Sequence, residues 1–197
     1  MADKSNSGNS DPKKEGALSW LDYVRKTDKE LLKICRVDTF RGSGKGGQKR
    51  NKTSNAVRLT LHKIAVTGSS SRSKAQNITS ALRKLRLAIA LENSSDFPRG
   101  THTEAFPEEI QPYISRNTIR IRSQNPVFPI FVGCLLDHFF KLESDWKLVA
   151  AQFGVSNSQL RRFVDKHPGL RLALEGIQKD LTENKIETQK LNSRRAP

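Results

Sequence analysis

A basic, glycine-rich segment in the first third of the chain carries the residues best suited to chemistry. It reads Gly44-Lys45-Gly46-Gly47-Gln48-Lys49-Arg50-Asn51-Lys52. The segment lies in a stretch from Arg41 to Leu91 that holds twelve Lys and Arg residues and no Asp or Glu. A loop that is this flexible and this cationic predicts contact with a polyanion.

The positive charge of the whole protein is concentrated in this stretch. The 197 residues include 35 basic and 20 acidic side chains, so the other segments hold 23 basic residues against 20 acidic ones. Concentrated positive charge neutralises phosphates and gains affinity by releasing counterions. Nucleic acid is therefore the expected partner, and a solvated basic face without a ligand is the alternative.

The spacing of the glycines argues against a nucleoside-triphosphate site. A Walker-type loop needs Gly, four residues, then Gly-Lys followed by Ser or Thr. Here Thr39 stands five positions before Gly44, and Gly46 follows Lys45. A glycine-rich loop that only makes turns stays open as an alternative.

Local patterns around this loop predict a small antiparallel sheet. Two short helices are expected within 19–34, the second with a capping box formed by Thr27 and Glu30. A strand at 35–40 leads into the loop, and strands at 56–61 and 64–67 follow it. A turn at His62-Lys63 would pair Leu61 with Ile64 and Leu59 with Val66, which puts these apolar side chains on one face.

One long helix is expected to cover this sheet. Apolar residues recur at helical spacing between residues 74 and 92. They are Ile78, Ala81, Leu82, Leu85 and Ile89. The fold class is therefore α+β.

Three elements of the sequence, in this order, resemble one known family. They are Arg41-Gly42-Ser43-Gly44 before Gly46-Gly47-Gln48, the run from Asn51 to Arg58, and Arg72-Ser73 with Asn77. The resemblance is to the Gly-Gly-Gln catalytic domain of peptide chain release factors and of stand-alone ribosome-rescue peptidyl-tRNA hydrolases. It covers about residues 31–91. The chain departs from the usual family residues at Lys45, at the His62-Lys63 turn and at Lys74.

The resemblance implies an enzyme that hydrolyses the ester between a nascent peptide and the terminal ribose of tRNA in the ribosomal P site. Gly46, Gly47 and Gln48 are the expected catalytic residues. Gln48 has no titratable group near neutral pH, so its role is to donate a backbone hydrogen bond to developing charge and to orient water. The two glycines allow a close approach to RNA that a β-carbon would obstruct. No cofactor and no metal are expected.

The basic and amide residues near the tripeptide become candidate contacts to ribosomal RNA or tRNA, mostly through phosphate. They are Lys45, Lys49, Arg50, Asn51, Lys52, Arg58, Arg72 and Lys74. For each, a solvated side chain is the simpler alternative. Asn51 and Asn55 have a second alternative, which is to order the loop by local hydrogen bonds.

A second, mostly helical module is expected after a linker rich in proline. A helix at 128–142 precedes a helix-turn-helix-like pair at 145–166, with Gly154 in the turn and Ser156 as the cap of the second helix. That helix carries three candidate nucleic-acid contacts: Arg161, Arg162 and Lys166. An ordinary helical hairpin is the alternative.

Five segments are expected along the chain. They are a disordered tail at 1–17, a catalytic domain at 18–96, a linker at 97–117, the helical module at 118–178 and a flexible C-terminal tail at 179–197. Only about forty residues precede the loop, so no stop-codon decoding domain is expected and the action should be independent of the codon.

The expected protein is a cytoplasmic monomer without a membrane partner. It acts on stalled ribosomes, with large-subunit ribosomal RNA and peptidyl-tRNA as partners and an accessory rescue or recruitment factor as a further candidate. Two alternatives stay open: a non-catalytic ribosome- or RNA-binding protein, and a DNA-binding helix-turn-helix regulator.

Overall fold

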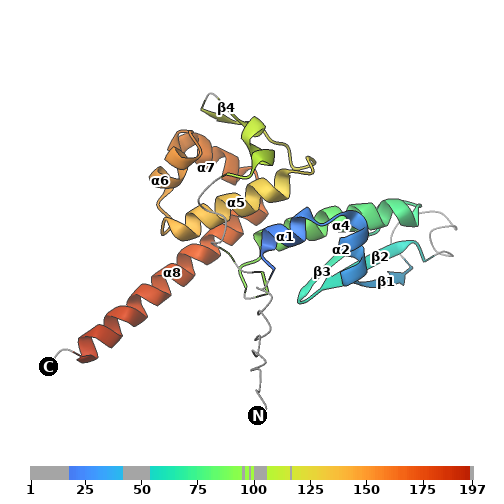
Figure 1. The fold of residues 1–197 in the computed structure, drawn as a ribbon. Helices are drawn as coiled ribbons and strands as arrows, with labels where there is room; N and C mark the ends of the chain where they lie inside the picture. Colours follow the sequence, from blue (N-terminus) through green and yellow to red (C-terminus); the bar gives the residue numbers. More distant parts are fainter. Residues whose placement is uncertain are drawn as a thin grey trace, which may run out of the picture.

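The protein is described from a computed structural model, which covers residues 18–41, 54–94, 96, 97, 99, 106–115 and 117–195, with side chains to residue 187. The first lobe contains α1 (Trp20–Arg25), α2 (Asp28–Ile34), β1 (Arg36–Phe40), β2 (Ala56–Leu61), β3 (Ile64–Gly68) and α4 (Lys74–Leu91). The second lobe contains the 3₁₀ helix η1 (Glu108–Tyr113), β4 (Ile114–Ser115), β5 (Thr118–Ile119), α5 (Phe128–Lys141), α6 (Trp146–Gln152), α7 (Asn157–Asp165) and α8 (Pro168–Arg195). Figure 1 shows the two lobes side by side, with α8 projecting from the second.

The sheet of the first lobe has the order β1-β2-β3, and both strand pairs are antiparallel. The predicted hairpin is confirmed, since Leu61 pairs with Ile64 and Leu59 with Val66. The chain turns at His62, whose φ of 49° is an uncommon value for a residue other than glycine. The edge strand β1 lies partly beyond the cover of α4, so Val37 stays 41% exposed.

The helix boundaries follow from side-chain caps. Thr27 accepts a hydrogen bond from the Glu30 backbone and the Glu30 carboxylate accepts one from the Thr27 N–H, so the predicted capping box is present. Ser19 and Asp22 form a second capping box at α1. The cap of the second helix of the helix-turn-helix-like pair is also confirmed, since Ser156 accepts from the Gln159 N–H.

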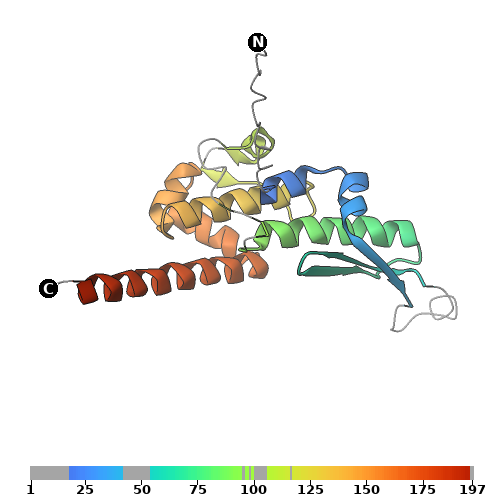
Figure 2. The same cartoon turned by 60° about the horizontal axis from the view of Figure 1, so that its bottom comes forward.

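The long helix α4 packs along one face of the sheet (Figure 2). Its predicted apolar stripe is buried at Ala81, Leu82, Leu85 and Ile89. Strand β3 approaches the start of α4 at Gly68, where an added β-carbon would lie 2.0 Å from the backbone oxygen of Asn77. Only glycine permits this approach without a shift of one of the two elements.

We therefore expect Gly68→Ala to lower the free energy of unfolding by about 1–3 kcal/mol, the usual cost of overpacking a tight contact. Urea denaturation followed by circular dichroism measures the change. Gly169→Ala is the matched control, because its added carbon would meet only Leu91 Cδ1, at 3.4 Å. Equal midpoints for the two variants would contradict the close approach.

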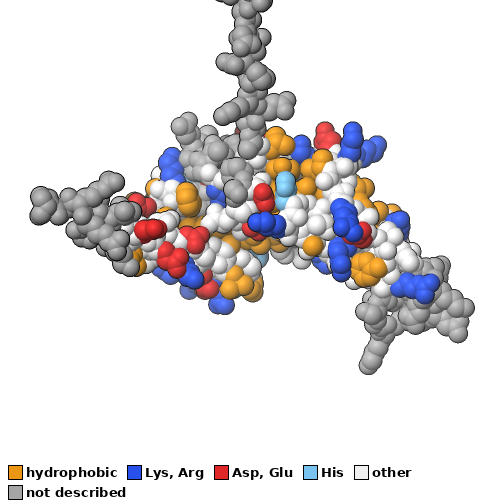
Figure 3. All heavy atoms as spheres, turned by 90° about the horizontal axis from the view of Figure 1, so that it is seen from below, with side chains coloured by type: hydrophobic (Ala, Val, Ile, Leu, Met, Phe, Trp, Pro, Cys, Tyr) orange, Lys and Arg blue, Asp and Glu red, His pale blue; other side chains and the backbone are white. Residues whose placement is uncertain are grey.

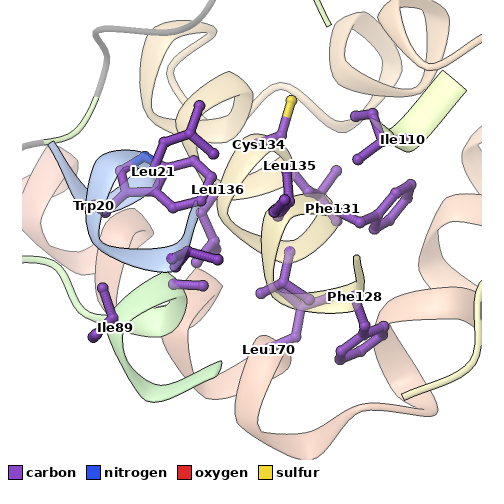
Figure 4. Packing of buried hydrophobic residues seen from close by; sticks show 14 of the residues in the cluster. Trp20, Leu21, Ile89, Ile110, Phe128, Phe131, Cys134, Leu135, Leu136 and Leu170 are labelled. Atoms are coloured by element: carbon purple, nitrogen blue, oxygen red, sulfur yellow. The ribbon is translucent and has the colours of Figure 1, made fainter. Parts of the chain in front are cut away.

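The central element of the second lobe is α5, which is buried along almost its whole length. Side chains from α1, α4, η1 and α8 converge on it, including Trp20, Ile89, Ile110 and Leu170 (Figure 4). One hydrophobic core therefore extends through both lobes. Burial raises the pKa of the Cys134 thiol on this helix, and no disulfide joins the two cysteines.

Two of the segments expected from the sequence differ from what the structure shows. The proposed linker at 97–117 includes η1 and β4, and its residues Phe97 and Ile110 are buried in the common core. The proposed flexible tail at 179–197 continues helix α8 to Arg195. The proposed tail at 1–17 lies outside the described residues.

A buried polar cluster joins the lobes. The Asp137 carboxylate on α5 accepts a hydrogen bond of 2.9 Å from the indole of Trp20 on α1. Its other oxygen lies 3.4 Å from the Arg99 guanidinium, and the two side chains are only 0% and 3% exposed. Arg99 also donates to backbone carbonyls at the end of α4, 2.8 Å to Glu92 and a shorter bond to Ala90. Burial lowers the pKa of Arg99, against the opposing effect of the Asp137 carboxylate.

Candidate functional site

The candidate site lies where β1 ends and β2 begins. The expected catalytic residues Gly46, Gly47 and Gln48 lie outside the described residues, as do Lys45, Lys49, Arg50, Asn51 and Lys52. The structure describes the frame that holds both ends of this segment. Phe40 pairs with Ala56 in the β1-β2 ladder, so residues 41–55 leave and rejoin the sheet on adjacent strands.

Asn77 is the main element of this frame. Its side chain is fully buried on the first turns of α4. Its amide nitrogen donates to the carbonyls of Asn55 and Ser71, at 2.7 and 2.9 Å, and its amide oxygen accepts from the Ser71 N–H at 2.9 Å. A single side chain thus ties the returning end of the loop to the segment between β3 and α4.

Asn55 adds a second connection between the same segments. Its side-chain nitrogen donates to the carbonyl of Arg72 at 2.9 Å. The bond reaches a residue 17 positions away, so the alternative that Asn55 orders the loop by local hydrogen bonding stays a prediction. The segment it reaches also carries Ser73, the N-cap of α4.

We expect Asn77→Ala to cost about 1–3 kcal/mol of unfolding free energy, because it leaves partly buried backbone groups of Asn55 and Ser71 without their side-chain partner. Amide hydrogen exchange should show faster exchange at residues 54–57 and 69–73. Thr79→Ala is the control, since Thr79 lies exposed on the same helix. Unchanged exchange in the first variant would show that Asn77 does not hold this frame.

The described basic residues of the site occupy two faces. Arg72 and Lys74 are exposed beside the N-terminus of α4. Arg58 is exposed on the face of the sheet opposite α4, with its guanidinium 5.4 Å from the centre of the Phe40 ring. Figure 3 shows Lys and Arg side chains over this lobe, while acidic side chains gather over the other. The structure therefore places Arg72 and Lys74 with the Asn77 frame and separates Arg58 from them.

The second module presents its three basic candidates on α7 and at the C-cap of that helix. Arg161, Arg162 and Lys166 are all exposed, while Leu160 and Phe163 of the same helix are buried. Arg161 lies 4.3 Å over the Trp146 ring and donates a 3.1 Å hydrogen bond to Asn157. Gly154 in the preceding turn has a φ of 58°, as a tight turn at this position requires. These groups form a surface of their own, separate from the Asn77 frame.

Sequence reasoning missed the contacts that fix the lobes, above all Arg99 with Asp137. The only available signals were an arginine in a proline-rich segment and an acid in an apolar helix. Neither shows which partner it meets. Among the residues that the structure describes, no helix is long and apolar enough to cross a membrane.

The fold and site define a small α+β domain whose helix-covered sheet carries a basic, glycine-rich segment between adjacent strands. Residues 28–126 match the RF-1 domain, and this match covers half of the chain. The chain therefore belongs to the RF-1 domain family.

Curated relatives carry release-factor names. The chain is 35% identical over 127 residues to peptide chain release factor 1 of Lachnoclostridium phytofermentans, covering 61% of this chain and 33% of the relative. It is 32% identical over 105 residues to peptide chain release factor 1 of Xylella fastidiosa, covering 52% and 27%. It is 46% identical over 56 residues to peptide chain release factor 2 of Neorickettsia sennetsu, covering 27% and 15%. The chain thus spans a third or less of the length of these relatives, and no solved structure matches it.

Proposed function

We propose that the protein hydrolyses the ester of peptidyl-tRNA on stalled ribosomes, without reading a codon. The observation that carries this proposal is Gly46-Gly47-Gln48 in an acid-free loop held between two adjacent strands of an RF-1 domain. The names of the relatives, peptide chain release factors 1 and 2, support a function in translation termination and protein biosynthesis.

In the proposed reaction, water attacks the carbonyl carbon of the ester, the bond from this carbon to the terminal ribose oxygen of tRNA breaks, and a proton from the water ends on that oxygen, which gives a free peptide carboxyl group and a ribose hydroxyl. Gln48 cannot take the proton from water as a general base, because its amide does not titrate near neutral pH. Its backbone N–H stabilises the charge that develops on oxygen, and its side chain orients the water. The Asn77 frame fixes the returning end of this loop at Asn55, and preorganisation of such an attachment point lowers the entropy cost of binding.

The basic residues supply the affinity for ribosomal RNA and tRNA. Arg72 and Lys74 lie at the attachment point of the loop, and Lys45, Lys49, Arg50 and Lys52 lie within the loop sequence. We assign them to phosphate contacts, whose affinity falls steeply with salt concentration. Arg161, Arg162 and Lys166 form a second basic surface that contacts nucleic acid elsewhere in the same complex. A cytoplasmic, monomeric protein that uses no cofactor fits this proposal.

Release of labelled peptide tests the function and its independence of the codon. Ribosomes with peptidyl-tRNA in the P site are prepared on messengers truncated after that site, and on messengers that place a stop or a sense codon next. Release on truncated complexes alone defines a rescue hydrolase, and release on all three defines action independent of codon and messenger length. Release confined to the stop codon would overturn codon independence. Binding to ribosomes without release on any complex would favour the non-catalytic alternative.

A further inference from the structure

A groove with an apolar floor lies at the junction of the two lobes. This open groove has a volume of about 510 Å³, within the range of pockets that bind ligands. Three parts of the chain line it. They are residues 24–28, which run from the end of α1 to the start of α2, the face of α4 with Thr79, Arg83 and Arg86, and the start of α5 with neighbouring Glu109. Anything bound there touches both lobes.

The floor of the groove is aliphatic. Val24, Pro129 and Ile130 are buried, and Val127 with the exposed Pro126 continues this surface toward solvent. None of the described residues that line the groove is aromatic. The floor therefore suits aliphatic side chains and lacks the flat ring on which proteins commonly stack an unpaired base.

Two arginines of the rim are already paired. Arg25 makes a bidentate pair with Glu109, at 2.8 and 2.9 Å. Arg86 lies 2.7 Å from the Asp28 carboxylate and donates to the carbonyls of Val24 and Lys26, at 3.1 and 2.7 Å. These contacts hold the wall of the groove in one geometry.

One further cation of the rim, Arg83, has no such partner. Within the described part of the chain, no carboxylate forms an ion pair with Arg83, which is exposed on the same face of α4 as Arg86. The groove thus combines an aliphatic floor with unpaired positive charge at its mouth. Its chemical complement carries a carboxylate next to aliphatic side chains.

We propose that this groove binds an acidic, aliphatic peptide segment of a partner protein. A carboxylate of the segment pairs with Arg83, and an aliphatic side chain beside it packs on Val127 and Ile130. A nucleic-acid strand fits less well. It carries a phosphate at every nucleotide, and these negative charges would be repelled by the carboxylates of Asp28 and Glu109. A peptide places one negative charge at one point. The proposal does not depend on ester hydrolysis.

Selection from a displayed library of random 12-residue peptides tests the proposal on the full-length chain without ribosomes. Enriched sequences should carry Asp or Glu beside Leu, Ile or Val. Synthetic peptides from the selection are then titrated by fluorescence anisotropy. We expect Arg83→Glu to weaken binding by about tenfold or more, as the loss of a charge-assisted contact does. Lys141→Glu makes the same change of charge sign on an exposed residue at the far end of α5 and should leave binding within about twofold.

Amide chemical shifts locate the bound peptide. The proposal is supported if adding peptide changes the amide chemical shifts of Thr79, Arg83 and Val127 in the wild type and leaves these amides unchanged in Arg83→Glu. Failure to enrich acidic aliphatic sequences, or equal binding by Arg83→Glu and the wild type, would overturn the proposal. Shifts of these amides with a 12-nucleotide oligouridylate, without shifts from the selected peptides, would assign the groove to RNA instead. Because the titration uses no ribosomes, its result is separate from that of the peptide-release assay.

Discussion

Gly47→Ala should lower the rate of peptide release on ribosomes by about 10²- to 10³-fold, the loss seen when a preorganised donor to a developing oxyanion is removed or misplaced. The reason is steric, since a β-carbon beside Gln48 obstructs the close approach of the backbone to RNA. Single-turnover release from truncated complexes, at saturating protein, measures the change.

The measurement on Gly47→Ala needs two controls. Gly176→Ala makes the same substitution on α8, where an added β-carbon would meet nothing within 4 Å. It should release peptide at the wild-type rate. The unfolding free energy of Gly47→Ala should equal that of the wild type, and its ribosome affinity should fall far less than its rate. Normal single-turnover release by Gly47→Ala would refute the catalytic assignment.

The second large effect concerns the buried pair of Arg99 and Asp137. Arg99→Met should lower the unfolding free energy by about 3–5 kcal/mol, because it leaves the Asp137 carboxylate buried without its cation. Asp137→Asn should also destabilise the protein strongly, since it leaves the Arg99 guanidinium uncompensated while keeping an acceptor for Trp20. Chemical denaturation followed by tryptophan fluorescence and circular dichroism measures both.

The double variant decides between a coupled pair and two separate structural effects. When both charges are removed together, much of the single-variant loss should be recovered, because no buried charge is left alone. Losses that simply add in Arg99→Met/Asp137→Asn would show that the charges do not act as a pair. The peptide-release rate of each folded variant also reports whether docking of the lobes affects the reaction.

Elements fixed by local rules could be predicted from the sequence. The turn at His62-Lys63 and the pairing of Leu59 with Val66 follow from alternation alone, and the apolar stripe of α4 follows from helical spacing. The capping box of Thr27 and Glu30 involves residues three positions apart. Each of these signals is complete within a short window of sequence.

Contacts between distant positions could not be predicted in this way. Trp20 and Asp137 are 117 positions apart, and nothing in either local sequence indicates the other. Phe97 and Ile110 lie in a proline-rich segment that is typical of a linker, yet both are buried in the common core, where the Phe97 ring contacts Tyr23 and His62 of the first lobe. At the candidate site, the motif pointed to Asn77, but the three hydrogen bonds that make it a connector require the fold.

Packing in the core of the second lobe determines where the far end of the projecting helix α8 lies. Leu170, Leu174 and Ile177 are buried, whereas Ile186 is 46% exposed, so the packed turns lie at one end of the helix. At 1.5 Å per residue its 28 residues span roughly 42 Å. From Leu174 to residue 195 the helix spans roughly 32 Å, so a tilt of about 10° at the packed turns moves its far end by roughly 5 to 6 Å. A substitution at Leu174 that shifts this packing would therefore relocate residue 195 without changing the sequence of the projecting part (Figure 1).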